Sequence, residues 1–295
     1  MQDLLKTIDE AMPSLSKGQK MIARYIRDHY DRAAYMTASR LGEEVGVSES
    51  TVVRFAIELG FDGYPDLQHT IQETVRMRLT SLQRIEVANH RLGDTHVLDA
   101  TLSSDAEKIK YTLEHIDRAA FEHAVGALLE ARTIYIIGMR ASLPLAEFLH
   151  YYLSYMFENV RLIRTTSGSE IFEQLMRMDE RDVLLAVSFP RYSTRIVNAV
   201  EYAAQSGARV VSITDSAHSP IAEGAYAVLT ARSDMASFVD SLVAPLSIID
   251  ALLAAVAQKK QDELSATLQK LEDVWDKFNV YDKNTAASER RHSEE

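Results

Sequence analysis

GVSESTVVRFAIELGF, residues 46–61, places a glycine and two serines just before a run whose apolar residues recur at helical spacing. Gly46 can adopt the positive φ that a tight turn between two helices requires. Gly42 is small where two such helices cross. The positions at which the helices must pack are all apolar, namely Leu41, Val45, Val47, Val52 and Phe55. The stretch therefore predicts a helix-turn-helix.

The second helix of this motif would expose short hydroxyl side chains and one arginine. Hydroxyl groups and free N–H groups at a helix start can hold phosphates, and Arg54 can donate two hydrogen bonds to guanine. The alternative is an ordinary helical hairpin, in which Gly46 ends one helix and Ser48 caps the next. The residues that we expect to contact DNA are Lys17, Ser48, Ser50, Thr51 and Arg54.

The rest of residues 1–80 also has helical patterns. Ser14 or Ser16 can cap a helix that carries Ile22, Ala23 and Ile26, and Thr37 can cap the helix that carries Leu41. We therefore expect an all-α helix-turn-helix domain at 1–80.

Beyond residue 120, short β-rich runs alternate with helical stretches. Strands spaced in this way indicate a parallel sheet with helices on both faces. We expect this α/β domain at 121–260, after a polar helical linker at 81–120 with a turn at 93–96. The runs are ARTIYIIG (131–138), VRLI (160–163), DVLLAVSF (182–189), ARVVSITD (208–215) and AYAVL (225–229).

The chain after the last strand is first apolar and then polar. The run LVAPLSIIDALLAAVA, residues 242–257, is apolar on nearly all sides. This composition predicts a buried helix, either beneath the sheet or at a subunit interface. We expect an amphipathic C-terminal helix within 261–282 and a disordered polar tail at 283–295.

The composition limits the class of protein. The 295 residues, 46% of them hydrophobic, can form two ordinary cores. Because there is no cysteine, disulfides and thiolate zinc sites are excluded. The histidines lack the i, i+4 pairing that favours a metal site, and no segment resembles a signal peptide or a membrane span. We expect a cytoplasmic protein without metal, cofactor or membrane contact.

The formal charge of −11 is unusual for a protein that binds DNA. Residues 1–80 hold 10 Lys and Arg against 12 Asp and Glu, whereas residues 81–295 hold 22 against 31. Since Lys and Arg neutralise phosphates, a single helix-turn-helix domain should bind DNA weakly. We expect a homo-oligomer, dimer or tetramer, on a palindromic operator in double-stranded DNA. An ordinary solvated face is the alternative for the cations Lys17, Lys20, Arg24 and Arg32.

Two runs in the first part of the chain carry a family resemblance. They are LSKGQKMIARYI, residues 15–26, and MTASRLGEEVGVSESTVVRFAIELGFDGYPDLQ, residues 36–68. They resemble the N-terminal domain of the RpiR family of bacterial transcription regulators, whose signature GVSxxTVxRFxxxLGFxGYxxLQ is long and specific. The resemblance implies a regulator that binds DNA.

Three runs in the second part resemble the sugar isomerase (SIS) domain, the sugar-phosphate-binding module of these regulators. They are IYIIGMRAS (134–142), DVLLAVSFPRYSTR (182–195) and GARVVSITDSAHSPIAEGAYAVL (207–229). The chain departs from the pattern twice, because Arg140 replaces a glycine and SFPRYST (188–194) replaces the usual SxSGxT loop. The resemblance implies an SIS-like fold and an effector that is an anionic sugar derivative, such as a sugar phosphate.

Each altered loop contains an arginine, and a guanidinium can grip phosphate or carboxylate with two hydrogen bonds. Both loops follow strands at the edge where open α/β sheets bind ligands. Helix capping is the alternative role for Ser142 and Ser188, and Tyr192 is expected to pack. The hydroxyls of TSGSE (166–170) lie after another strand. The residues that we expect to bind the effector are Gly138, Arg140, Ser142, Ser188, Arg191, Ser193, Thr194 and Arg195.

Two other functions compete with a regulator. An aldose-ketose isomerase needs a general base, for which His218 and Glu223 are the only suitable residues near the third loop, and it leaves residues 1–80 without a role. A DNA-organising protein without a ligand leaves the arginine loops unexplained. We therefore expect a transcription regulator that responds to a ligand and has no catalytic residues.

Overall fold

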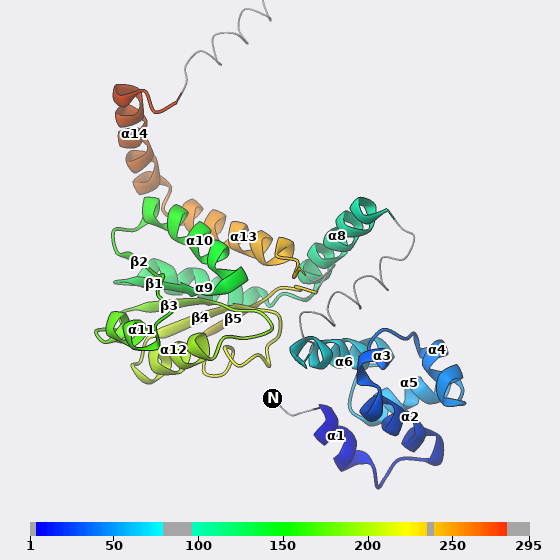
Figure 1. Ribbon diagram of the computed structural model, residues 1–295. Coiled ribbons are helices and arrows are strands. Elements are labelled where there is room, and N and C mark those ends of the chain that lie inside the picture. Colours follow the sequence, from blue (N-terminus) through cyan, green and yellow to red (C-terminus); the bar gives the residue numbers. More distant parts are fainter. Residues whose placement is uncertain (1–3, 79–95, 235–238, 282–295) are drawn as a thin grey trace, which may run out of the picture.

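The computed structural model describes residues 4–78, 96–234 and 239–281, which form two regions with separate cores (Figure 1). The N-terminal region is entirely helical, as predicted. The expected turn at 93–96 lies almost wholly outside the described residues, and the expected tail at 283–295 lies wholly outside them. The helices of the N-terminal region are α1 (Leu4–Ala11), α2 (Lys17–Asp28), α3 (Tyr30–Ala33), α4 (Ala38–Val45), α5 (Glu49–Glu58) and α6 (Tyr64–Arg78).

The turn between α4 and α5 confirms the predicted helix-turn-helix. Gly46 has a φ of 77° and ends α4 in the left-handed conformation. A Cβ atom on Gly42 would lie 2.8 Å from the carbonyl oxygen of Val47, so only glycine permits this approach of the two helices. Leu41, Val52 and Phe55 are fully buried in the core of the region.

The helix starts of this region also agree with the sequence. Ser16, rather than Ser14, caps α2, and it forms a capping box with Gln19. Thr37 caps α4 by accepting a hydrogen bond from the backbone of Arg40 over 3.2 Å. These caps define the first residues of α2 and α4. The cap of α2 therefore places Lys17 and Gly18 in its first turn.

Side chains of α6 hold the residues that follow α3 to the core. Tyr64 and Gln68 both donate hydrogen bonds to the carbonyl oxygen of Met36, over 2.7 and 2.8 Å. Gln72 donates to the carbonyl oxygen of Ala34 over 2.8 Å. Burial raises the pKa of Tyr64 to about 12, so its hydroxyl stays a donor at all ordinary pH values. The N-terminal region is therefore closed by polar bonds as well as by apolar packing.

The second region is the predicted α/β domain. Its five strands form one parallel sheet in the order β2-β1-β3-β4-β5. The strands are β1 (Ile134–Gly138), β2 (Val160–Ile163), β3 (Val183–Val187), β4 (Arg209–Thr214) and β5 (Ala227–Thr230). The helices are α8 (Val97–His115), α9 (Arg118–Glu130), η1 (Arg140–Ser142), α10 (Leu143–Met156), α11 (Gly168–Leu175), α12 (Thr194–Gln205), α13 (Val243–Lys259) and α14 (Gln261–Phe278).

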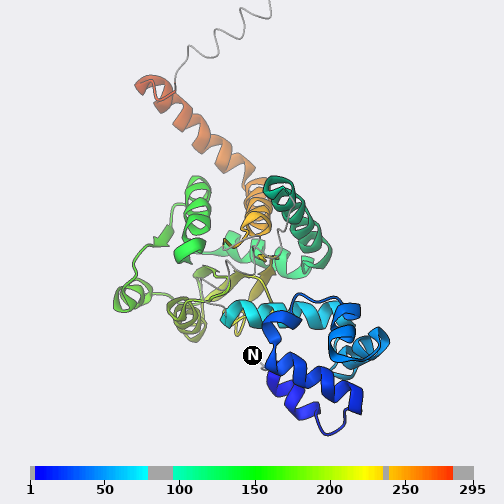
Figure 2. The same cartoon turned by 45° about the vertical axis from the view of Figure 1, so that its right-hand side comes forward.

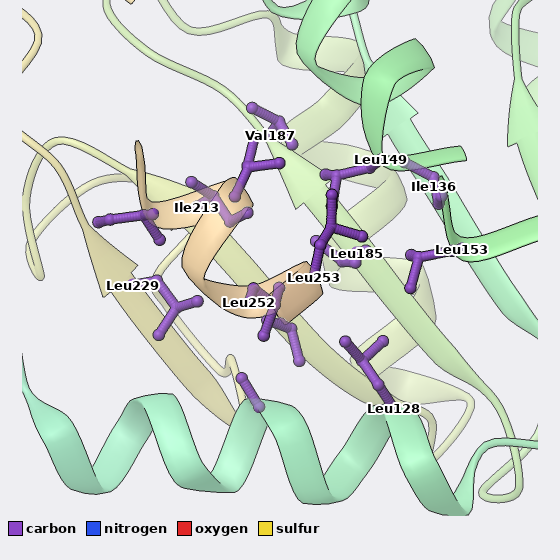
Figure 3. Packing of buried hydrophobic residues seen from close by; sticks show 14 of the residues in the cluster. Leu128, Ile136, Leu149, Leu153, Leu185, Val187, Ile213, Leu229, Leu252 and Leu253 are labelled. Carbon is purple, nitrogen blue, oxygen red and sulfur yellow. The ribbon is translucent and has the colours of Figure 1, made fainter. Parts of the chain in front are cut away.

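Helices cover both faces of this sheet. Side chains of α9, α10 and α13 share one core with the sheet, and those of α11 and α12 share the other. Leu252 and Leu253 of α13 lie among Leu149, Leu153 and Leu185 in the first core (Figure 3). The apolar run at 242–257 is thus buried beneath the sheet, the first of its two predicted environments.

The two helices at the ends of this region differ in their packing. α8 packs along α13. The sequence had instead predicted that these residues belong to a linker at 81–120. α14 extends away from the sheet, as both views show (Figures 1 and 2), and none of its residues is buried. None of the helices in the described ranges has the length and apolar character needed to span a bilayer.

Candidate functional sites

The sheet reverses its direction of growth between β1 and β3. From β1 the chain passes through α10 to β2 on one side, and from β3 it passes through α12 to β4 on the other. Open α/β sheets bind ligands at the carboxyl ends of strands where this reversal occurs. A cavity of about 250 Å³ lies there, between the loop of Met139–Ser142 and the loop of Ser188–Ser193, and Asp240 and Leu242 complete its wall. We call it the switch-point cavity.

The loop after β1 folds back tightly on its strand. A Cβ atom on Gly138 would lie 2.6 Å from the carbonyl oxygen of Ser142 and 2.9 Å from the Cβ atom of Ala146. Arg140 has a φ of 55°, a left-handed conformation that glycine adopts freely and that other residues rarely adopt. The exposed arginine therefore occupies a backbone position suited to glycine.

The loop after β3 is tied to the loop after β1. Ser193 stands before the first residue of α12, and its hydroxyl donates to the sulfur of Met139 over 3.5 Å. Tyr192 donates to a carboxylate oxygen of Asp215 over 2.6 Å, so it connects this loop to the end of β4. Tyr192 thus has a structural role, and it does not line the switch-point cavity.

The serines of the switch-point cavity do not act as helix caps. Ser142 and Ser193 occupy cap positions, but neither side chain accepts a hydrogen bond from its helix. Ser188 stands at the end of β3, five residues before that cap position. The hydroxyls of Ser142 and Ser188 have no hydrogen-bond partner among the described residues. These hydroxyls therefore remain available to a ligand.

The switch-point cavity is lined by two arginines and one acidic residue, Asp240, so its charged side chains are mainly positive. Arg140 and Arg191 are exposed there and form no ion pair with any residue that the structure describes. α10 and α12 both begin at this edge, and neither has an acidic residue in its first turn. Helix starts and guanidinium groups both favour anions. The arrangement suits a small molecule with one anionic group.

The eight residues predicted to bind the effector divide into two groups. Gly138 is buried behind the cavity wall, and Thr194 and Arg195 lie exposed on α12 without lining it. The five that line the cavity are Arg140, Ser142, Ser188, Arg191 and Ser193.

Three hydroxyls of the run 166–170 also lie outside the cavity. The hydroxyls of Ser167 and Ser169 bond to one another over 3.0 Å at the start of α11. Thr166 is exposed next to them. His218 and Glu223, the candidate bases of an isomerase, are exposed and do not line the cavity either.

Sequence reasoning missed Asp240. The residues considered there all lay in or next to loops that directly follow the strands β1 to β4, whereas Asp240 precedes the apolar run 242–257. The order of the elements could have indicated this residue. β5 lies at the edge of the sheet, so the chain must cross back over the sheet to reach α13, and Asp240 lies on that return.

A second groove, of about 480 Å³, lies between the starts of α2 and α5. A Cβ atom on Gly18 would be 3.4 Å from the methyl group of Thr51 and from a methyl group of Val47, so the two helix starts lie close together. α2 has no acidic residue in its first turn. α5 carries Glu49 in its first turn, so the start of α2 is the more favourable of the two helix starts for a phosphate. Its lining residues are Ser16, Gly18, Gln19, Val47, Ser48, Thr51 and Arg54.

Hydroxyls and one arginine line the α5 side of this groove. The hydroxyl of Ser48 lies 3.0 Å from that of Ser50 and 2.9 Å from that of Thr51. Arg54 folds back along α5 and donates to the carbonyl oxygen of Ser50 over 3.2 Å. Of the five residues predicted to contact DNA, Ser48, Thr51 and Arg54 line the groove, and Ser50 and Lys17 are exposed beside it.

Two family descriptions match the chain. Residues 2–77 match the helix-turn-helix domain of the rpiR family, and residues 127–255 match the SIS domain. A curated relative, an uncharacterized HTH-type transcriptional regulator of Clostridium perfringens, is 24% identical over 88% of this chain and 94% of its own length.

Two solved structures are similar to the chain. The sugar isomerase domain of an RpiR transcription factor from Sphaerobacter thermophilus is 28% identical, with a TM-score of 0.56 over 58% of this chain and 96% of that one. The Vibrio vulnificus NanR protein complexed with ManNAc-6P is 22% identical, with a TM-score of 0.58 over 94% of this chain and 99% of that one. The similarity to NanR therefore extends over both regions and concerns the fold.

Proposed function

The chain belongs to the rpiR family of helix-turn-helix transcription regulators and carries a SIS domain, and we propose that a small sugar-derived anion, bound in the switch-point cavity, controls its affinity for operator DNA. The single observation that carries this proposal is the cavity wall, in which Arg140 and Arg191 meet the unbonded hydroxyls of Ser142 and Ser188. Arginine guanidinium groups and serine hydroxyls can both donate hydrogen bonds to the oxygens of a phosphate or carboxylate.

A sugar monophosphate is the effector class that fits best. The cavity, at about 250 Å³, lies just below the range of roughly 300–1,000 Å³ that drug-sized ligands occupy, so it suits one monosaccharide. The complex of Vibrio vulnificus NanR with ManNAc-6P is a precedent within this fold for such a ligand. Asp240, on the same wall, can accept hydrogen bonds from sugar hydroxyls.

We also propose that the operator is read by a homodimer, because the N-terminal region alone carries more acidic than basic residues. The apolar residues of α14 repeat at intervals of four and three, the spacing of a coiled-coil seam. None of them is buried within the chain; Leu264 packs partly against the core of its own chain, and the rest of the seam is open to α14 of a second copy. The residues of the seam are Leu264, Leu268, Leu271, Trp275 and Phe278.

A role in binding rather than turnover accords with the positions of the titratable side chains. Isomerisation needs a general base beside the substrate. His218 and Glu223 lie outside the cavity, so neither is placed to act on a ligand held there.

The test pairs ligand binding with operator binding. Full-length protein is screened against sugar phosphates, sugar acids and inorganic phosphate by thermal shift, and each hit is then titrated in an operator-binding assay. A ligand at about 100 times its dissociation constant should stabilise the protein by roughly 2.7 kcal/mol, and it should change operator affinity about 5- to 150-fold.

The double variant Arg140→Ala with Arg191→Ala should lose the response to every hit and keep the operator affinity of the free protein. Arg177→Ala, an exposed arginine remote from the cavity, is the matched control. If the double variant binds a hit as tightly as the wild type, the cavity is not the effector site.

A further inference from the structure

Residues 240–242, just before α13, touch both the switch-point cavity and α8. Asp240 and Leu242 line the cavity, and Ser241 stands between them. The hydroxyl of Ser241 points the other way, because it donates to a carboxylate oxygen of Asp105 on α8 over 2.7 Å. One hydrogen bond thus joins the cavity wall to α8.

Asp105 is itself held by a buried cation. The ammonium group of Lys108, whose residue is only 3% exposed, donates to the same oxygen of Asp105 over 3.1 Å and to the hydroxyl of Ser104 over 2.9 Å. A buried ammonium that loses its partners is costly, so Asp105 cannot move away from Lys108 alone. Ser104, Asp105 and Lys108 therefore form one bonded cluster on α8, and Ser241 is attached to it.

A residue that follows β5 is bound to α8 at a second place. The backbone N–H of Arg232 donates to the hydroxyl of Thr112 over 3.0 Å, and the guanidinium of Arg232 lies 4.7 Å from the ring centroid of Tyr111. This contact lies near the C-terminal end of α8, about two turns from Asp105. It anchors α8 to the sheet, whereas the Ser241–Asp105 bond is the one adjacent to the cavity.

We propose that the hydrogen bond between Ser241 and Asp105 transmits occupancy of the switch-point cavity to α8, an inference that rests on the effector site proposed above. α8 is the first described helix after residue 78, so it is the part of the α/β region that follows the DNA-binding region along the chain. A ligand that shifts Asp240, by hydrogen bonds from sugar hydroxyls or by repulsion from its anionic group, displaces Ser241 as well. The position of α8 then differs between the free and the bound protein, and this difference biases the DNA-binding regions.

Amide hydrogen exchange on the full-length chain tests the inference. The probes are inorganic phosphate and ManNAc-6P, each compared with chloride at the same ionic strength. In the wild type, we expect slower exchange in the two cavity loops and, by about fivefold or more, in α8 between residues 100 and 112.

The decisive variant is Ser241→Ala, which removes the hydroxyl and leaves the cavity wall intact. We expect its cavity loops to be protected as in the wild type, while α8 no longer responds. Ser241→Thr keeps the hydroxyl and should restore the response of α8. The matched control is Ser247→Ala, because this exposed serine on α13 bonds only to Val243 of its own helix.

The outcomes distinguish a failure of the proposed effector site from a failure of the proposed coupling through Ser241 and Asp105. If α8 of Ser241→Ala still responds as in the wild type, or if α8 never responds although the loops do, the coupling is wrong and the effector site stands. If neither anion protects the cavity loops in any protein, the effector site itself is refuted, and the coupling with it. Thermal unfolding of each variant in chloride separates both results from a failure to fold.

Discussion

The carbonyl oxygen of Ser142 lies 2.6 Å from the position that a Cβ atom on Gly138 would occupy. The end of β1 and the start of α10 can therefore be this close only with glycine at 138. Because this approach turns Arg140 and Ser142 toward the loop after β3, the geometry of the switch-point cavity depends on a residue that does not line it.

Gly138→Ala should therefore destabilise the α/β region, by about 1–3 kcal/mol, the usual cost of forcing a methyl group into a packed site. Urea unfolding followed by circular dichroism measures the change. Gly126→Ala is the control, since nothing lies within 4 Å of the added methyl group in the middle of α9. Alanine there should stabilise the helix by about 0.5–1 kcal/mol. Equal effects of the two changes would contradict the close approach.

Arg140→Gly should separate stability from ligand binding. The left-handed backbone at 140 costs a non-glycine residue about 1–2 kcal/mol, and glycine removes this cost. Glycine also raises the conformational entropy of the unfolded chain, which lowers the stability by about 0.4–1 kcal/mol. We expect the unfolding free energy to stay the same or rise slightly. Affinity for an anionic effector should fall by about 1.5–3 kcal/mol, the contribution of hydrogen bonds to charged groups.

Chemical denaturation and calorimetry on the same samples measure the two quantities. Arg177→Ala, which should change neither of them beyond about 0.5 kcal/mol, is the surface control. A variant that loses stability and keeps full affinity would assign Arg140 a purely structural role.

Much of the fold could be predicted because its signals are local. Gly42 and Gly46 are required by backbone geometry within one motif, and the strands are short apolar runs. The loops after β1 and β3 were predictable for a similar reason, since the carboxyl ends of neighbouring parallel strands meet at one edge. The packing of α8 was not predictable, because its bonds to Ser241 and Arg232 join residues more than 100 positions apart.

The environment of the apolar helix α13 also depends on residues far away in the sequence. The sequence of 242–257 fits burial under a sheet or between subunits, and only the assembled core decides. Leu252 is fully buried within the chain, so Leu252→Asp tests folding rather than assembly.

Assembly is better tested on α14. Leu268→Asp places a charge in the exposed apolar seam, where the side chain has no contact with the core of its own chain. We expect a shift from dimer to monomer in analytical ultracentrifugation, weaker operator binding, and an unfolding free energy of the isolated chain within about 0.5 kcal/mol of the wild type.

Ala266→Asp, on the opposite side of α14, is the matched control and should remain a dimer. If Leu268→Asp also remains a dimer, the seam is not the interface. The exposed apolar row of α8, which includes Leu98, Leu102, Ile109 and Leu113, is then the next surface to change.

The groove between α2 and α5 predicts different roles for two neighbouring side chains. Arg54 is long enough to leave Ser50 and reach a base edge, whereas Thr51 lies against the start of α2, where a phosphate would sit between two helix ends. Arg54→Ala should cost about 1–3 kcal/mol on the cognate operator and relax preference at one base pair. Thr51→Ala should weaken binding to all sequences alike.

Selection from randomised operators, followed by titration at several salt concentrations, separates these effects. Lys17→Ala, which removes a cation next to the groove, should lower the salt slope by about one and leave sequence preference unchanged. Arg27→Ala is the control, because this arginine lies at the far end of α2 and bonds to Asp28. If Arg54→Ala retains both the affinity and the preference of the wild type, α5 does not read bases, and the acidic chain must obtain its specificity from another surface.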